Sequence, residues 1–190
     1  MAETTSSSRD AERDGVPATA RRRAYFFALA VAAALLHNVV HESVHLLAAT
    51  LVGESVEAFR LFTNGWGTSQ VVFATPVEAR QGASWLVIAW TPAVVTTALG
   101  FLTYLNRRRL LGPWKVVNAF VFFVAVFFMM LDPFYFGVLS SLIGGDIGAA
   151  AAVGLPTWPV RAVALAVLAL GVLAYRRWRG EARGEPDRYA

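Results

Sequence analysis

Long apolar stretches separated by short polar segments dominate the sequence. They cover about residues 24–52, 83–105, 116–143 and 160–175, and a run of about 20 apolar residues is enough to cross a bilayer as a helix. Residues 55–75 differ: they are rich in β-branched and aromatic residues on both sides of an Asn-Gly pair, a pattern typical of a β-hairpin. The pattern predicts an all-α polytopic membrane protein with about four transmembrane helices and a small β-hairpin after the first.

The two ends of the chain are polar. Residues 1–23 and 177–190 lack apolar periodicity, so we expect disordered tails on either side of a membrane domain over residues 24–176. Arginine clusters occur at 21–23, 106–115 and 176–179, and four spans would bring all three to one side. Because Lys and Arg near helix ends stay in the cytoplasm, we expect both the N- and the C-terminus to be cytoplasmic. We also expect the protein to be integral to the membrane of a prokaryotic cell.

Composition narrows the possible chemistry. The chain is 56% hydrophobic, has a formal net charge of +4 and contains no cysteine. A metal ion must therefore be held by His, Asp or Glu side chains, since thiolates are absent. The positive charge is clustered at helix ends and not spread along a stripe, which argues against nucleic acid as a partner and favours contact with the lipid bilayer.

The first apolar segment contains the strongest candidate for chemistry, the pattern H-E-x-x-H in "HESVH". On a helix, His41 and His45 share a face and can bind one metal ion, while Glu42 lies beside it and can take a proton from a water molecule. A third histidine, His37, lies one turn earlier; it could assist a substrate, support a ligand or simply pack between helices, and the last is favoured.

An alternative is that these groups are structural. A buried histidine often only donates to a carbonyl, and Glu42 could pair with Arg60 or Arg80. However, an ionisable group in a transmembrane segment costs roughly 2.5–3.5 kcal/mol on insertion scales, which favours a functional role.

A catalytic zinc site usually has three protein ligands, so one more is needed. Asp132 lies in an apolar run just before Pro133, where we expect the helix to break, and at the same depth in the membrane as the histidines. Asp146 follows a glycine pair and could open a short helix. It can reach the histidines only if residues 133–145 fold back, and otherwise it would cap a helix at the membrane surface.

The segment "HESVHLLAATLVGESVEAFRLF" resembles the start of the site-2 protease (M50) core of intramembrane zinc metalloproteases. The family pattern H-E-x-x-H-x-x-x-A-x-x-x-G is matched by His41, Glu42, His45, Ala49 and Gly53, and the resemblance extends over roughly residues 30–158.

The second motif departs from the family. Where the family has L-D-G, this chain has "LDP" at 131–133 and "GGD" at 144–146. Similarity to divergent members favours Asp146 and membrane depth favours Asp132, so both remain candidates.

The resemblance implies an intramembrane zinc metalloendopeptidase. Zn²⁺ would be held by His41, His45 and one aspartate, with Glu42 as the base. The substrate would be a helix of another membrane protein, unwound and held along the hairpin edge, where we expect contacts from the loop and strand residues Asn64, Ser69 and Gln70. The alternatives are a non-catalytic M50-like protein that binds metal or client helices, and a small metal-handling carrier. The sequence does not predict an oligomeric state.

Overall fold

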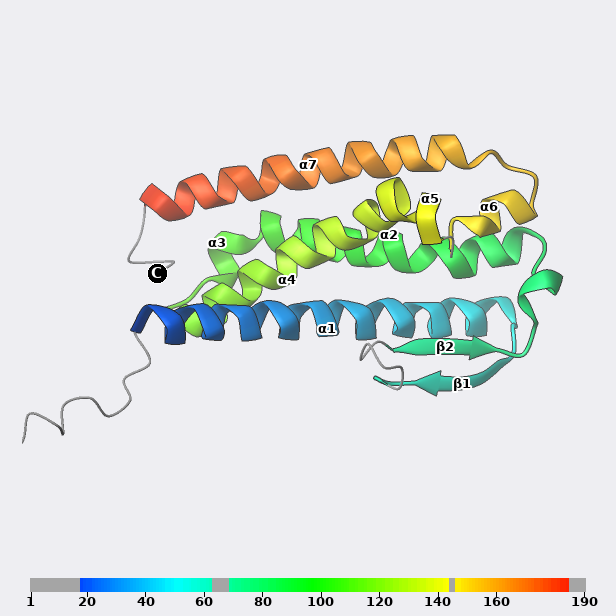
Figure 1. Cartoon of the computed structure of the whole chain (residues 1–190), viewed down its shortest axis with the longest axis horizontal. Coiled ribbons are helices and arrows are strands. Elements are labelled where there is room, and N and C mark those ends of the chain that lie inside the picture. The colour runs from blue at the N-terminus through cyan, green and yellow to red at the C-terminus, as the bar shows by residue number, and fades with distance from the viewer. Residues whose placement is uncertain (1–17, 63–68, 144–145, 185–190) are drawn as a thin grey trace, which may run out of the picture.

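Four long helices form the body of the protein. The computed structural model describes residues 18–62, 69–143 and 146–184. Its long helices are α1 (Ala18–Val52), α2 (Ala83–Leu105), α4 (Lys115–Phe134) and α7 (Thr157–Gly184), which run alongside one another (Figure 1). Within the described part of the chain, four helices are long and apolar enough to cross a membrane. The predicted fold class is confirmed.

The helices pack in three layers. Helices α2 and α4 lie against each other in the centre, α1 packs on both, and α7 packs on α4 from the opposite side (Figure 1). A Cβ atom on Gly100 of α2 would lie 2.4 Å from the backbone nitrogen of Met129 in α4. Glycine is therefore needed for the two backbones to approach this closely.

Helix ends differ from the prediction at both termini. Helix α1 begins at Ala18, so residues 18–23, predicted to be disordered, are helical. Helix α7 continues to Gly184, so residues 177–184 are helical too. Hydropathy marks only the part of a helix that lies in lipid, and arginine, a good helix former, extends it beyond that part. The other predicted tail residues, 1–17 and 185–190, lie outside the described residues.

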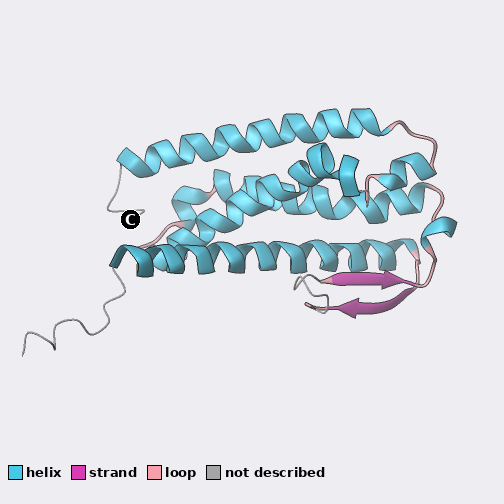
Figure 2. Ribbon diagram, viewed as in Figure 1, coloured by secondary structure: helices cyan, strands magenta, loops and turns pink. Residues whose placement is uncertain are grey.

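The predicted hairpin is present. Strands β1 (Val56–Arg60) and β2 (Gln70–Phe73) pair antiparallel, with a bulge between Val56 and Ala58 (Figure 2). Strand β2 is the inner one and packs on α1. The predicted Asn-Gly turn lies at residues outside the described part of the chain.

The third apolar segment does not break at Pro133, contrary to the prediction. Helix α4 runs through this proline to Phe134, continues as a π-helical turn, η3 (Tyr135–Leu139), and ends in α5 (Ser140–Ile143). Proline lacks the N–H that would bond four residues back, and in membrane helices this loss is tolerated because neighbouring groups and helices compensate for it. The chain then forms the short helix α6 (Gly148–Ala152) before α7.

The two ends of the bundle differ in character. The start of α1, the short helix α3 (Arg107–Leu110) and the end of α7 lie together (Figure 1). We call this the arginine-rich end, because all three predicted clusters fall there. The hairpin and α6 lie at the other end, the hairpin end. Which end faces the cytoplasm stays a prediction.

Candidate metal centre

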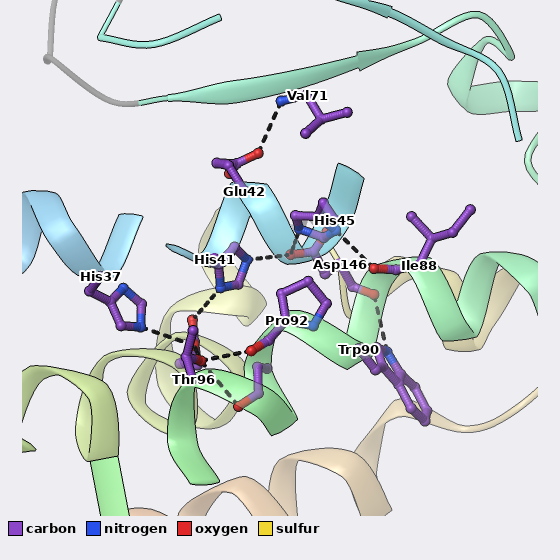
Figure 3. A network of polar contacts seen from close by, with 12 residues as sticks. His37, His41, Glu42, His45, Val71, Ile88, Trp90, Pro92, Thr96 and Asp146 are labelled. Atoms are coloured by element: carbon purple, nitrogen blue, oxygen red, sulfur yellow. Dashed lines mark hydrogen bonds and ion pairs between the residues drawn. The ribbon is translucent and has the colours of Figure 1, made fainter. Parts of the chain in front are cut away.

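The H-E-x-x-H pattern lies on α1, where the rings of His41 and His45 lie one turn apart and meet edge to face (Figure 3). Their ring centroids are 4.8 Å apart, and the two residues are only 9% and 6% exposed. The rings face α2, α4 and Asp146. The local helical spacing therefore does what the sequence predicts: it brings two imidazoles to one place.

Helix α2 fixes the orientation of His45. Its Nδ1 lies 2.8 Å from the carbonyl oxygen of Ile88 (Figure 3). Ile88 is four residues before Pro92, which has no N–H to give, so this carbonyl lacks its helical partner. His45 Nδ1 must therefore be the protonated nitrogen that donates to it. The Nε2 atom of the neutral ring then carries a free lone pair.

Asp132 of α4 lies on the other side of His41. Its Oδ1 is 3.0 Å from His41 Nδ1, at an angle too bent for a full hydrogen bond, and no other partner of this nitrogen is found in the described part of the chain. Its Oδ2 is 3.0 Å from His37 Nε2 and also accepts a hydrogen bond from Thr96 Oγ1. Asp132 is 5% exposed. A carboxylate surrounded by these donors keeps the proton of His41 on Nδ1 and leaves its Nε2 free, as for His45.

Asp146 approaches the histidines from the other direction. Its Oδ2 lies 3.8 Å from His41 Nε2 and 3.6 Å from His45 Nε2, and its backbone oxygen accepts a hydrogen bond of 3.3 Å from Trp90 Nε1 (Figure 3). Burial raises the pKa of Asp146, but its interactions with the two histidines lower that pKa to about 2. The chain therefore folds back after Pro133, which is the condition under which Asp146 could reach the histidines.

Two overlapping groups of the described residues bring their ligand atoms close enough for a metal ion. One is His37, His41 and Asp132, and the other is His41, Glu42 and His45. In the first, 3.0 Å contacts join the rings to the carboxylate, which is an ordinary hydrogen-bond distance. The gaps from Asp146 Oδ2 to the two Nε2 atoms are too long for hydrogen bonds. A zinc ion bound at about 2.0–2.2 Å from nitrogen and oxygen would fit within either gap.

Glu42 is oriented by the hairpin. Its Oε2 accepts a hydrogen bond of 3.0 Å from the backbone N–H of Val71 in β2 (Figure 3). One turn earlier, Asn38 Oδ1 accepts a hydrogen bond of 2.5 Å from the backbone N–H of Ser69. Four helix residues rise about 6 Å and two strand residues about 6.6 Å. Asn38 and Glu42 of α1 therefore match the N–H groups of Ser69 and Val71 on the edge of β2 that faces away from β1.

The structural alternative for Glu42 is not supported. Among the described residues, no ion pair joins Glu42 to Arg60 or Arg80. Glu42 instead lies within ligand distance of the two histidines, with the hairpin contact as its hydrogen bond. The sequence-based interpretation of Glu42 as a group that faces the histidines is consistent with this geometry.

Several polar contacts at the site were not predicted. Asn38, Trp90 and Thr96 each bind a candidate residue or the strand beside it. The sequence did indicate a role for Asn38, because it is polar in an apolar helix and lies four residues before Glu42, on the same face. Of the three predicted substrate contacts, Ser69 is buried, and its backbone N–H donates to Asn38. Gln70 is exposed and lies opposite Arg60 in the hairpin. Asn64 lies outside the described residues.

Comparison with known proteins does not add to this picture: no family model, no curated protein and no solved structure matches the chain. The assignment of a function therefore depends on the chemistry of the site.

Proposed function

We propose that the protein is an intramembrane zinc metalloendopeptidase with His41, His45 and Asp146 as metal ligands. The observation that carries the proposal is the orientation of the two rings. The Nδ1 atoms of His41 and His45 face Asp132 and the Ile88 carbonyl, so both Nε2 atoms face the Asp146 carboxylate. Two imidazoles and a carboxylate form a donor set that zinc accepts.

Asp132 is assigned a supporting role. Both of its oxygens already receive contacts from rings or from Thr96, so it needs no cation to be satisfied. A carboxylate that accepts the second ring N–H of a metal-binding histidine orients the ring and makes it a better ligand. His37 contacts the same carboxylate at 3.0 Å and supports it from the opposite side.

The reaction that this arrangement supports is peptide hydrolysis. A bound zinc ion would polarise the scissile carbonyl and acidify a water molecule. Glu42 would accept the proton of the attacking water and pass it to the leaving amine. The Val71 N–H holds one Glu42 oxygen, which limits rotation of the carboxylate and keeps it beside the histidines.

The substrate would be an extended segment of another membrane protein. A transmembrane helix has its amides bonded internally, so it must unwind before it can be cleaved. Pairing of this segment with β2, along the edge that faces α1, would require Asn38 and Glu42 to release the N–H groups of Ser69 and Val71.

The first test is the zinc content of the detergent-purified protein. We expect close to one zinc per chain in the wild type, and near-complete loss in His41→Ala, His45→Ala and Asp146→Ala, while Asp132→Ala retains weakened binding. Loss of zinc in Asp132→Ala with full retention in Asp146→Ala would reverse the assignment of the third ligand. Wild-type protein that stays free of zinc after reconstitution would contradict the proposal.

Glu42→Gln separates hydrolysis from metal binding. The amide is close in shape to the carboxylate but cannot accept the proton, so cleavage of a membrane-peptide library should fall by about 10²- to 10⁴-fold with zinc content unchanged. Glu78→Gln, at an exposed position beyond the hairpin, is the matched control. A metal-loaded wild type that cleaves nothing would favour a non-catalytic, metal-binding protein. Cleavage that persists in Glu42→Gln would remove this residue from the mechanism.

A further inference from the structure

A cavity opens beside the candidate metal ligands at the hairpin end. It has a volume of about 330 Å³, and both His45 and Asp146 line it. Its other walls come from β2, from the start of α2 and from the small residues of α6. Ligand sites are typically concave and mostly apolar, with a few polar groups that fix the orientation of the ligand. The charged and polar side chains that line this cavity are the candidate metal ligands His45 and Asp146 and one arginine, Arg80.

Arg80 is held rigidly in the cavity wall. It follows the 3-10 turn η2 (Val77–Ala79), and its Nε donates a hydrogen bond of 3.0 Å to the carbonyl oxygen of Thr75. Its guanidinium carbon lies 5.0 Å from the ring centroid of Phe73 and 4.9 Å from that of Trp85. Cation–π contacts of this kind favour one orientation of the group. The two rings also pack edge to face, with centroids 5.3 Å apart, so the support is itself fixed.

The charge of Arg80 is not neutralised by the described residues. No described carboxylate lies within 4.0 Å of its guanidinium, whereas Arg107 at the other end of the bundle pairs with Glu181 at 2.7 Å. Within the described chain, Arg80 uses only its Nε–H in hydrogen bonding. The guanidinium has further N–H donors in a planar fork, which suits the two oxygens of a carboxylate.

We infer that Arg80 binds a carboxylate of the peptide that occupies this cavity and so selects substrates with an acidic group near the bond to be cleaved. The inference rests on the proposed function, because it places the peptide between Arg80 and the candidate metal ligands. The acidic group is either an Asp or Glu side chain or a free C-terminus, since both present the same carboxylate. The cavity's apolar walls at Trp85 and Ile88 would strengthen the ion pair by limiting access of water.

The test uses zinc-loaded, full-length protein in detergent and two sets of short peptides, one that ends in a hydroxamate and one that lacks it. In both sets, each peptide is made with either Asp or Asn at one position. In the set without the hydroxamate, each peptide is also made with either a free or an amidated C-terminus. Dissociation constants are measured by calorimetry. We expect the wild type to bind the carboxylate form about 10- to 100-fold more tightly than its amide. The peptide pair that shows this preference identifies the source of the carboxylate.

Variants assign the preference to Arg80. Arg80→Gln should bind acidic and neutral peptides equally. Arg80→Lys keeps the charge but loses the planar fork, so it should retain part of the preference. This second variant serves as the test if Arg80→Gln does not fold. Arg60→Gln is the matched control, because Arg60 is exposed on β1 and does not line the cavity. Equal binding of all peptides by the wild type, no binding at all, or an undiminished preference in Arg80→Gln would overturn the inference.

The same peptides without the hydroxamate are then tested on zinc-free protein. If the Arg80-dependent preference remains there while zinc never binds, binding of the peptide carboxylate by Arg80 stands and the proposed function fails. If hydroxamates bind only with zinc present but the Asp and Asn forms bind alike, the proposed function stands and the inference fails.

Discussion

The protein gathers charged groups at two places, and the two differ in whether the carboxylates pair with an arginine or lysine of the described chain. At the arginine-rich end, Arg107 is 8% exposed and binds both oxygens of Glu181, with its guanidinium also 4.4 Å from the ring centroid of Tyr104. Glu181 thus meets the buried guanidinium of Arg107, and the exposed Arg177 approaches the same carboxylate at 3.6 Å. At the hairpin end, Glu42, Asp132 and Asp146 gather around the histidines, and no arginine or lysine pairs with these carboxylates in the described part of the chain.

This difference shows what each cluster needs from outside. A buried charge without a partner is costly, and it is retained where it is compensated by another charge or by a metal ion. The Arg107–Glu181 pair is compensated within the chain and serves to join α3 to α7. The hairpin-end cluster has an excess of negative charge and lone pairs, so a bound cation would stabilise it.

Adding zinc gives the largest expected effect that separates the two clusters. A ligand that binds only the folded state stabilises it by about 4 kcal/mol at a concentration 1,000 times its dissociation constant. Thermal unfolding of the metal-free protein in detergent should shift upward with zinc, and His45→Ala should remove the shift. Arg107→Met should keep it, as the matched control at the other end. An equal shift in His45→Ala would place the zinc elsewhere.

Breaking the arginine-rich pair should give the next largest effect. Arg107→Met removes the buried guanidinium partner of Glu181, leaves the exposed Arg177 at 3.6 Å, and should lower the free energy of unfolding by about 1.5–3 kcal/mol. Adding Glu181→Leu should restore part of that loss, because the carboxylate that lost its buried partner is then gone as well. The measurement is thermal unfolding of both variants, with zinc affinity followed in parallel. A change in zinc affinity would mean that the two ends are coupled.

The sequence could predict those parts of the site that depend on local spacing. His41, Glu42 and His45 are neighbours on one helix, so their arrangement follows from the helical repeat alone. The hairpin and the number of long apolar helices likewise follow from patterns of residues close together in the chain. The helix ends at Ala18 and Gly184 did not follow, since a helix can continue after it has left the lipid.

The third ligand could not be chosen from the sequence, because both aspartates reach the histidines. Depth along a straight helix correctly placed Asp132 near His41. It could not tell which ring nitrogen Asp132 would meet, because the orientation of each ring depends on contacts with other parts of the chain. His45 is oriented by the Ile88 carbonyl, and His41 lies between Asp132 and Asp146. The position of Asp146 depends on the path through the π-helical turn, which the expected break at Pro133 did not describe.

Asp132→Asn gives the smallest expected effect, and it sharpens the distinction between a ligand and its support. The amide oxygen could still accept a hydrogen bond from His41 Nδ1, but the side chain lacks the negative charge. Its NH₂ group replaces the other oxygen and would place donors against a histidine ring or Thr96. Loss of such support usually lowers metal affinity by about 10- to 100-fold, measured here by zinc competition with a chelator. Thr96→Val, which keeps the carboxylate and removes one donor to it, should weaken binding less. Unchanged affinity in Asp132→Asn would mean that His41 keeps its tautomer without the carboxylate's charge. Complete loss of zinc would mean that Asp132 is itself a ligand.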